Sequence, residues 1–185
     1  KVKSHSSIEV LRGYQVVEHK GAVGNFQTRV AEVDGPRQMV IEHGTTIIAT
    51  GGREFHGSSY LLGADARVIT QAEMEKRLFA EDPSVMTAKS VVMIQCVGPW
   101  DDDQTVPFYC SRICCTVALK NAIKIKELNP EIAVVILFRD MRAYGFKESI
   151  YTTAREKGII FLRFDDRHKP RVSSKEGRLL VEIEE

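Results

Sequence analysis

The hydrophobic pattern divides the chain into a β-rich first part and a second part in which strands and helices alternate. In the first part, short apolar or alternating runs are separated by turns that contain Gly or Pro, as is typical of β-strands. These runs occupy residues 8–11, 14–17, 25–30 and 39–41. A β-branched run at residues 45–49 stops at two glycines and predicts a buried strand. Residues 81–84 are polar and contain a proline, so they are the best candidate for a linker.

The second part predicts a parallel sheet. Three runs lack alternation, as expected of strands that are covered on both faces. They occupy residues 90–94, 133–138 and 159–162. Helices are predicted between them at residues 112–128, with most of the circumference apolar, and at residues 147–157, ending before Gly158. The order β-α-β-α-β is typical of a parallel α/β unit with right-handed crossovers.

Two further elements complete the predicted order. A short helix over residues 68–78 carries the capping pair Thr70 and Glu73. A hairpin is predicted within residues 171–183. We therefore expect an α/β protein with two domains: a β-rich domain over residues 1–83 and a Rossmann-like domain over residues 84–185.

Composition and charge exclude several classes of function. The chain has 185 residues, of which 43% are hydrophobic, and 26 basic against 25 acidic side chains give a net charge of +1. Such a balance does not favour nucleic-acid binding. The longest apolar run has seven residues, whereas a membrane helix needs about 20, so no membrane insertion is expected. The polar start contains no signal peptide, and we expect a cytoplasmic protein.

The chain has four cysteines, Cys96, Cys110, Cys114 and Cys115. Cys96 lies just after the first parallel strand, and the other three lie at the start of the next helix. In parallel sheets, ligands bind where the carboxyl ends of strands meet loops and helix N-termini. The predicted fold therefore brings all four cysteines to one edge of the sheet.

Several chemistries suit such a cluster. Helix N-termini lower the pKa of thiols, and soft sulfur ligands suit iron–sulfur groups or zinc. Structural zinc usually takes paired Cys-x2–4-Cys knuckles, and no such pair of knuckles is present. Cys114 and Cys115 differ by about 100° on a helix, so both reach one centre only at an irregular helix start. An iron–sulfur group, zinc, a Cys110–Cys114 dithiol and plain buried cysteines all stay open, whereas disulfide scaffolding is disfavoured.

The segments around the cysteines resemble a known family. Residues 92–98, 109–115 and 118–120 look like the A subunit of heterodisulfide reductase and its relatives in the quinone-interacting oxidoreductase complexes of sulfate reducers. The likeness covers nearly the whole chain. It continues at residues 24–26, 43–44, 49–52, 142–145, Glu148 and Tyr151.

The resemblance implies an electron-transfer flavoprotein with a thioredoxin-reductase-like core, related to the pyridine nucleotide-disulfide oxidoreductases. Residues 1–83 would then be the β-rich end of a flavin domain. A [4Fe–4S] cluster would be held by Cys96, Cys110, Cys114 and Cys115. FAD, in the full-length protein, would lie near Ala49, Thr50, Gly51 and Gly52. Further subunits of a redox complex would be the partners.

This sequence departs from the family in two ways. Residues 99–103 replace the usual Ser-Arg and short loop with a proline, a tryptophan and three aspartates. No Gly-x-Gly-x-x-Gly fingerprint is present, and the chain does not begin with Met. We therefore expect an interior piece of a longer protein, which is not active alone and binds FAD poorly. The alternative is a non-catalytic Rossmann-like module with structural zinc or unligated cysteines.

Other polar residues carry weaker hypotheses. We expect His43 and His56 to be surface or hydrogen-bonded histidines, and residues 101–103 to form a solvated loop. Three charged residues follow the second parallel strand, namely Arg139, Asp140 and Arg142. A nucleotide ribose would lie there in a Rossmann unit, but the glycine-rich loop is missing and nucleotide binding is not expected. No nucleophile with a paired base is present, so no catalytic residue is predicted.

Overall fold

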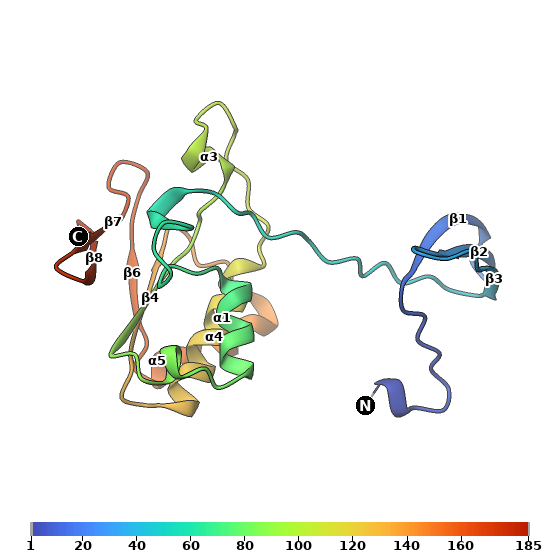
Figure 1. The fold of residues 1–185 in the computed structure, drawn as a ribbon, viewed down its shortest axis with the longest axis horizontal. Coiled ribbons are helices and arrows are strands. Elements are labelled where there is room, and N and C mark those ends of the chain that lie inside the picture. The colour runs from blue at the N-terminus through green and yellow to red at the C-terminus, as the bar shows by residue number, and fades with distance from the viewer. Residues whose placement is uncertain (1, 185) are drawn as a thin grey trace. The chain divides into compact units, whose positions relative to one another are not determined.

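The computed structural model describes residues 2–184 and is mixed α/β. The chain divides into two compact units between Gly52 and Arg53 (Figure 1). This division falls earlier than the domain boundary predicted after residue 83, because helix α1 (Gln71–Phe79) packs against helix α4 (Cys114–Leu128) of the second unit. The assignment of residues 1–83 to a flavin-type domain stays a prediction.

The first unit is an antiparallel sheet in the order β1-β2-β3. Its strands are β1 (Tyr14–Ala22), β2 (Asn25–Glu32) and β3 (Gln38–His43). They confirm the strands predicted around residues 14–17, 25–30 and 39–41. Val16, Val30 and Met39 are paired across the strands on one face. On the opposite face, Glu18 pairs with Arg29 at 3.0 Å.

A polar network lies within the apolar face of this sheet. The Thr28 hydroxyl is 2.7 Å from His19 Nδ1 and 2.8 Å from His43 Nε2. His43 Nδ1 also donates to the Thr45 carbonyl oxygen at 3.1 Å. Because Thr28 is only 8% exposed, these bonds satisfy a nearly buried hydroxyl. The prediction that His43 is a hydrogen-bonded histidine is confirmed.

Two predicted strands of the first part are wrong. Residues 8–11 form no strand, and a short 3-10 helix lies before them at Val2–Ser4. Residues 45–49 form neither a strand nor a buried segment, since Ile47 is 86% exposed and Ile48 is 83% exposed. Among the described residues no strand pairs with this run. A β-branched composition fits a sheet only where neighbouring strands supply partners.

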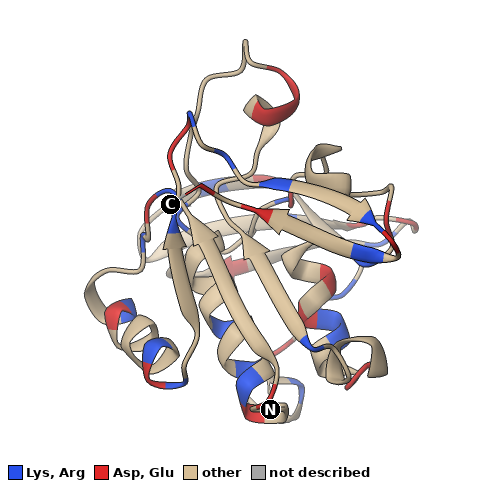
Figure 2. Cartoon of the chain, turned by 90° about the vertical axis from the view of Figure 1, so that its left-hand side faces the viewer, with Lys and Arg blue, Asp and Glu red and all other residues tan. Residues whose placement is uncertain are grey.

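The second unit contains the predicted parallel sheet, in the order β4-β5-β6. Its strands are β4 (Ser90–Ile94), β5 (Ala133–Phe138) and β6 (Ile160–Arg163). Helix α4 connects the first two strands, and helix α5 (Glu148–Glu156) connects the last two. The carboxyl ends of all three strands therefore lie at one edge, the end at which α3 (Pro99–Asp102) stands in Figure 2.

Helices and a hairpin lie on opposite sides of this sheet (Figure 1). Helices α1, α4 and α5 pack together on one side, and their core includes Leu119, Ile125 and Ile136, each 0% exposed. On the other side, the predicted hairpin crosses the strands (Figure 2). It consists of β7 (Arg171–Lys175) and β8 (Arg178–Glu182).

Short helices and helix caps complete the unit. The remaining short helices are α2 (Pro83–Met86) and the 3-10 turns Ser59–Leu61 and Gly145–Lys147. The expected cap of α1 is confirmed, because the Thr70 side chain accepts from the Glu73 N–H at 3.2 Å. Residues 81–84 lie within the second unit, where Asp82 caps α2 and Pro83 occupies its first turn. Among the described residues, no helix combines the length and apolar content needed to cross a bilayer.

Candidate cysteine site

The four cysteines lie at the carboxyl edge of the parallel sheet. Cys96 follows β4 by two residues, and Cys110 lies in the loop before α4. Cys114 and Cys115 are the first two residues of α4. All four are free thiols, and Cys115 is only 1% exposed. We refer to these four residues as the cysteine cluster.

The thiols of the cysteine cluster interact with one another. A hydrogen bond to Cys115, together with burial, raises the pKa of Cys114, and the charges of Cys115, Cys96 and Cys110 raise it further. The same hydrogen bond, now accepted from Cys114, lowers the pKa of Cys115 to about 6. The backbone N–H of Arg142 and its guanidinium charge lower that pKa further. The charges of the other three cysteines thus act on Cys114. Cys115 Sγ also donates to the Asp140 carbonyl oxygen at 3.6 Å.

Backbone geometry around the cluster is irregular. Cys96 has a φ of 62° and Arg112 a φ of 59°, in the left-handed region that non-glycine residues seldom adopt. Ile113, at the N-cap of α4, makes no side-chain capping bond. The backbone irregularity thus lies just before α4, and Cys114 and Cys115 are already helical.

The donor chemistry of the cluster fits an anionic sulfur-ligated group. Backbone N–H groups donate to two of the sulfurs, from Arg112 to Cys110 Sγ at 3.3 Å and from Arg142 to Cys115 Sγ at 3.4 Å. Such N–H bonds to sulfur are among the factors that set the potentials of iron–sulfur groups. Within residues 2–184, however, no three His, Cys, Asp or Glu side chains are already arranged to hold a metal ion.

A buried carboxylate holds the loop between Cys96 and Cys110. Asp101, with 8% of its side chain exposed, accepts from the Gly98 N–H at 3.0 Å and from Lys169 Nζ at 2.7 Å. Asp102 in turn accepts from Ser59 Oγ at 2.9 Å. The prediction of a solvated loop over residues 101–103 is therefore wrong for Asp101. We call the Asp101–Lys169 pair the loop clasp.

Aromatic side chains pack within the same loop. The Trp100 ring lies 4.8 Å from the Phe108 ring and 5.3 Å from the Tyr109 ring. The Trp100 ring also packs against Gly98, so closely that a Cβ atom at this position would clash with the ring. Nearby, burial raises the pKa of Tyr60 to about 12, with smaller contributions from the charges of Asp101 and Cys96.

Three buried polar atoms in the described residues have no hydrogen-bond partner. They are Gln95 Nε2, Trp100 Nε1 and Thr116 Oγ1. Sequence reasoning missed these side chains, as it missed Lys169. The one available clue was position, because Gln95 directly precedes Cys96 and Thr116 directly follows Cys115.

The remaining candidate residues are the predicted flavin segment and Arg139. Ala49, Thr50, Gly51 and Gly52 belong to the first unit, are exposed and lie outside any helix or strand. Arg139 pairs with Asp166 at 2.6 Å and lies 4.2 Å over the Phe108 ring.

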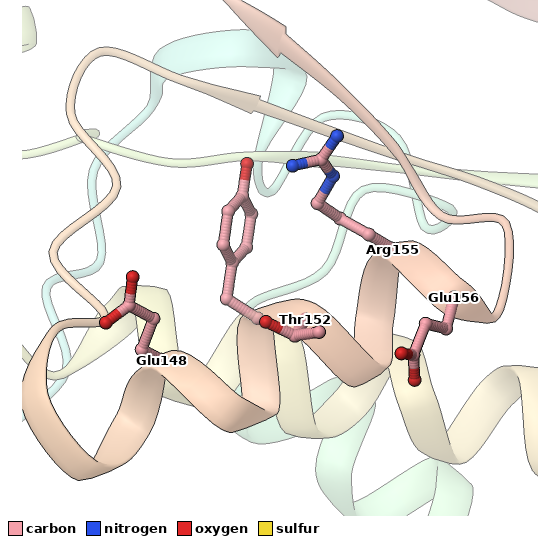
Figure 3. Close-up of a pocket in the computed structure, with 5 residues that line it drawn as sticks. Glu148, Thr152, Arg155 and Glu156 are labelled. Carbon is pink, nitrogen blue, oxygen red and sulfur yellow. The ribbon is translucent and has the colours of Figure 1, made fainter.

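A separate hollow of about 480 Å³ lies on α5 (Figure 3). It is lined by Glu148, Tyr151, Thr152, Arg155 and Glu156. All five residues come from one helix and none is a cysteine, so this hollow is not the candidate site.

The fold and the cysteine cluster together define a class: an α/β protein with a four-thiol site at the carboxyl edge of a parallel sheet. No protein-family model matches the chain. Curated relatives do match. The A subunit of the ferredoxin/F420H2-dependent CoB-CoM heterodisulfide reductase of Methanosarcina acetivorans is 36% identical over 163 residues, which is 80% of this chain and 20% of that protein.

Two further relatives carry similar names. The A subunit of the H2:CoB-CoM heterodisulfide,ferredoxin reductase of Methanothermobacter thermautotrophicus is 36% identical over 69% of this chain and 21% of its own length. The iron-sulfur A subunit of the CoB–CoM heterodisulfide reductase of Methanocaldococcus jannaschii is 36% identical over 69% of this chain and 22% of its own length. The chain thus spans about a fifth of the length of these relatives. Its resemblance to the A subunit of heterodisulfide reductase, an electron-transfer oxidoreductase, is confirmed.

Proposed function

We propose that this chain is an electron-transfer segment of a heterodisulfide reductase A-like flavoprotein. In this proposal Cys96, Cys110, Cys114 and Cys115 hold one [4Fe–4S] cluster. The carrying observation is that four free thiols follow one strand and begin the next helix at the carboxyl edge of the sheet, where backbone N–H groups donate to two of the sulfurs. One relative is named as an iron-sulfur subunit, which supports the choice of cofactor.

The chain's own residues have defined tasks in this proposal. When bound, the cluster supplies one-electron transfer at a potential set by its surroundings. The N–H groups of Arg112 and Arg142 stabilise negative charge on the sulfurs of Cys110 and Cys115. Burial of Cys115 keeps water from its sulfur, and the loop clasp holds the segment between Cys96 and Cys110.

The proposal extends to the longer protein. There, FAD lies near Ala49, Thr50, Gly51 and Gly52, and electrons pass between the flavin and redox centres of partner subunits through the cluster. The second unit serves as a Rossmann-like domain, and the protein works in the cytoplasm. Because Ala49–Gly52 is exposed, we expect the isolated chain neither to hold FAD nor to turn over substrate.

Anaerobic reconstitution tests the proposal. The chain is incubated with iron, sulfide and a thiol reductant, and iron and acid-labile sulfide are then counted. We expect four of each per chain, with the broad visible absorbance of an iron–sulfur group. Cys114→Ser should lose most of this absorbance. Tyr109→Phe, which changes the same loop without removing a sulfur, should keep it.

A thiol-based function is the second candidate, favoured by the four free thiols and by the pKa of Cys115, which is lowered to about 6. If reconstitution gives no cluster and thiol titration shows a reversible two-electron couple, a dithiol function replaces the proposal. Colourless binding of one zinc ion per chain would instead support a structural zinc module.

A further inference from the structure

The unpartnered buried polar atoms belong to residues next to the cysteines in the sequence or within the loop that joins them. Gln95 is 2% exposed and immediately precedes Cys96, yet its Nε2 has no partner among the described residues. Thr116 Oγ1 is equally unpaired and immediately follows Cys115. Since buried polar groups are almost always hydrogen-bonded, each of these unpaired atoms needs an explanation.

Ring contacts locate the third unpaired atom, Trp100 Nε1. The indole of Trp100 packs on Tyr109, the residue before Cys110, and against Gly98, two residues after Cys96. Its Nε1–H is therefore buried within the loop that joins two members of the cluster.

The same protein satisfies buried polar groups elsewhere. Asn121 lies on α4 and is 1% exposed, and its Nδ2 donates to the carbonyl and side-chain oxygens of Gln71 at 3.2 and 2.9 Å. In the described residues, the unpaired buried polar atoms thus belong to neighbours of the cysteines and not to the rest of the core.

We infer that Gln95, Trp100 and Thr116 donate hydrogen bonds to sulfur atoms of the cluster that the cysteines hold. An amide N–H, an indole N–H and a hydroxyl are all donors, and the indole N–H is a donor only. The partner of the Gln95 amide N–H and of the Trp100 indole N–H must therefore be an acceptor, as the thiolate and sulfide sulfurs of an anionic cluster are. This inference rests on the proposed function, because it requires the cluster.

The inferred hydrogen bonds should raise the reduction potential of the cluster. A donor to sulfur stabilises the reduced cluster more than the oxidised one, since the reduced cluster carries one more negative charge. Removing a donor therefore makes the chain harder to reduce. We expect each lost bond to shift the reduction equilibrium by up to about tenfold, which is 59 mV for a one-electron couple.

The experiment compares variants that remove a donor at nearly constant volume. Thr116→Val and Gln95→Met delete single donors, and Trp100→Phe deletes the third. Thr152→Val is the matched control, because it removes an exposed helical hydroxyl on α5. Each chain is reconstituted with iron and sulfide, and its midpoint potential is measured by a redox titration followed by electron paramagnetic resonance. Urea unfolding of the metal-free chains is measured in parallel.

Thr116→Val and Gln95→Met should lower the potential, while the metal-free chains stay as stable as the parent or become more stable, because an unpaired buried polar group has gone. The control should change neither quantity. Unchanged potentials in loaded variants would overturn the inference alone. So would variants that lose stability without metal, since the buried polar atoms would then be paired by water or protein. If the parent chain forms no cluster, the proposed function and this inference both fail.

Discussion

The loop clasp is the contact whose loss should be felt most clearly in the metal-free chain. Asp101 joins its own loop to Lys169, which lies 68 residues further along the chain, between β6 and β7. The substitution Asp101→Ala removes both hydrogen bonds of the carboxylate without adding bulk. Asp101→Asn is the conservative variant, because it keeps the shape and one acceptor oxygen but loses the charge.

The expected loss of unfolding free energy follows from the burial of Asp101, Gly98 and Lys169. Gly98 is buried, so Asp101→Ala leaves its N–H unpaired, at a cost of about 1–3 kcal/mol. Lys169 keeps 36% of its side chain exposed and returns to water, so the lost ion pair adds only about 1 kcal/mol. We expect Asp101→Ala to lower the free energy of unfolding by about 2–4 kcal/mol in total, and Asp101→Asn by about half as much.

The assay uses a probe that the chain already has. Trp100 is the only tryptophan, and it is the residue next to Asp101, so its fluorescence reports unfolding of this loop directly. Urea unfolding is followed under reducing, metal-free conditions for the parent, Asp101→Ala, Lys169→Met and the double variant. The two single changes should show a coupling of about 1 kcal/mol. Additive effects of the single variants, or a change below about 0.5 kcal/mol for Asp101→Ala, would refute the clasp as a stabilising contact.

Three other predictions follow from buried or paired groups. Thr28→Val should lower the free energy of unfolding by about 1–3 kcal/mol, because both histidine rings lose their partner, whereas Thr28→Ser should retain most of it; circular dichroism of the first-unit sheet checks this. Leu119→Ala, at a 0% exposed site, should cost about 2–5 kcal/mol in urea unfolding, and exposed Lys120→Ala next to it should cost almost nothing. Hydrogen bonds from the Arg67 side chain lower the pKa of Asp65 to about 2. This group therefore stabilises the fold above the usual aspartate pKa, and that contribution is lost as the pH falls from about 4 towards 2. The urea midpoint of Asp65→Asn should depend less on pH in that range.

Local patterns were enough to predict the parallel sheet of the second unit and the helices that connect its strands. The runs at 90–94 and 133–138 coincide with β4 and β5, because a strand covered on both faces is apolar at every position. Helix α1 begins after Thr70, as the spacing to Glu73 predicted. The helix predicted at 112–128 begins at Cys114, because Arg112 has a left-handed backbone that helical periodicity cannot reveal.

Contacts between distant segments explain what the sequence did not reveal. A run of three aspartates predicts that Asp101 is solvated, and only the fold shows that Lys169 donates a hydrogen bond to it. The run at 45–49 has the composition of a buried strand, yet strand formation depends on a neighbour that composition does not specify. Gln95 and Thr116 carry no motif, so their unpaired atoms emerge only from burial.

Among the described residues, the unpaired buried donors are not spread evenly. Gln95 Nε2, Trp100 Nε1 and Thr116 Oγ1 all lie in or beside the segments that carry the cysteines. Cys96 and Arg112 in these segments have a left-handed backbone, as do Tyr60, Leu61, Glu81 and Glu176. Strain and unpaired polar groups raise the free energy of the empty fold. A ligand that binds only the folded chain offsets such costs, and it raises stability in proportion to the logarithm of its concentration over its dissociation constant. If the cysteine cluster holds its metal group as proposed, loading should therefore stabilise the second unit against urea, and chelation should return the unfolding midpoint to that of the metal-free chain.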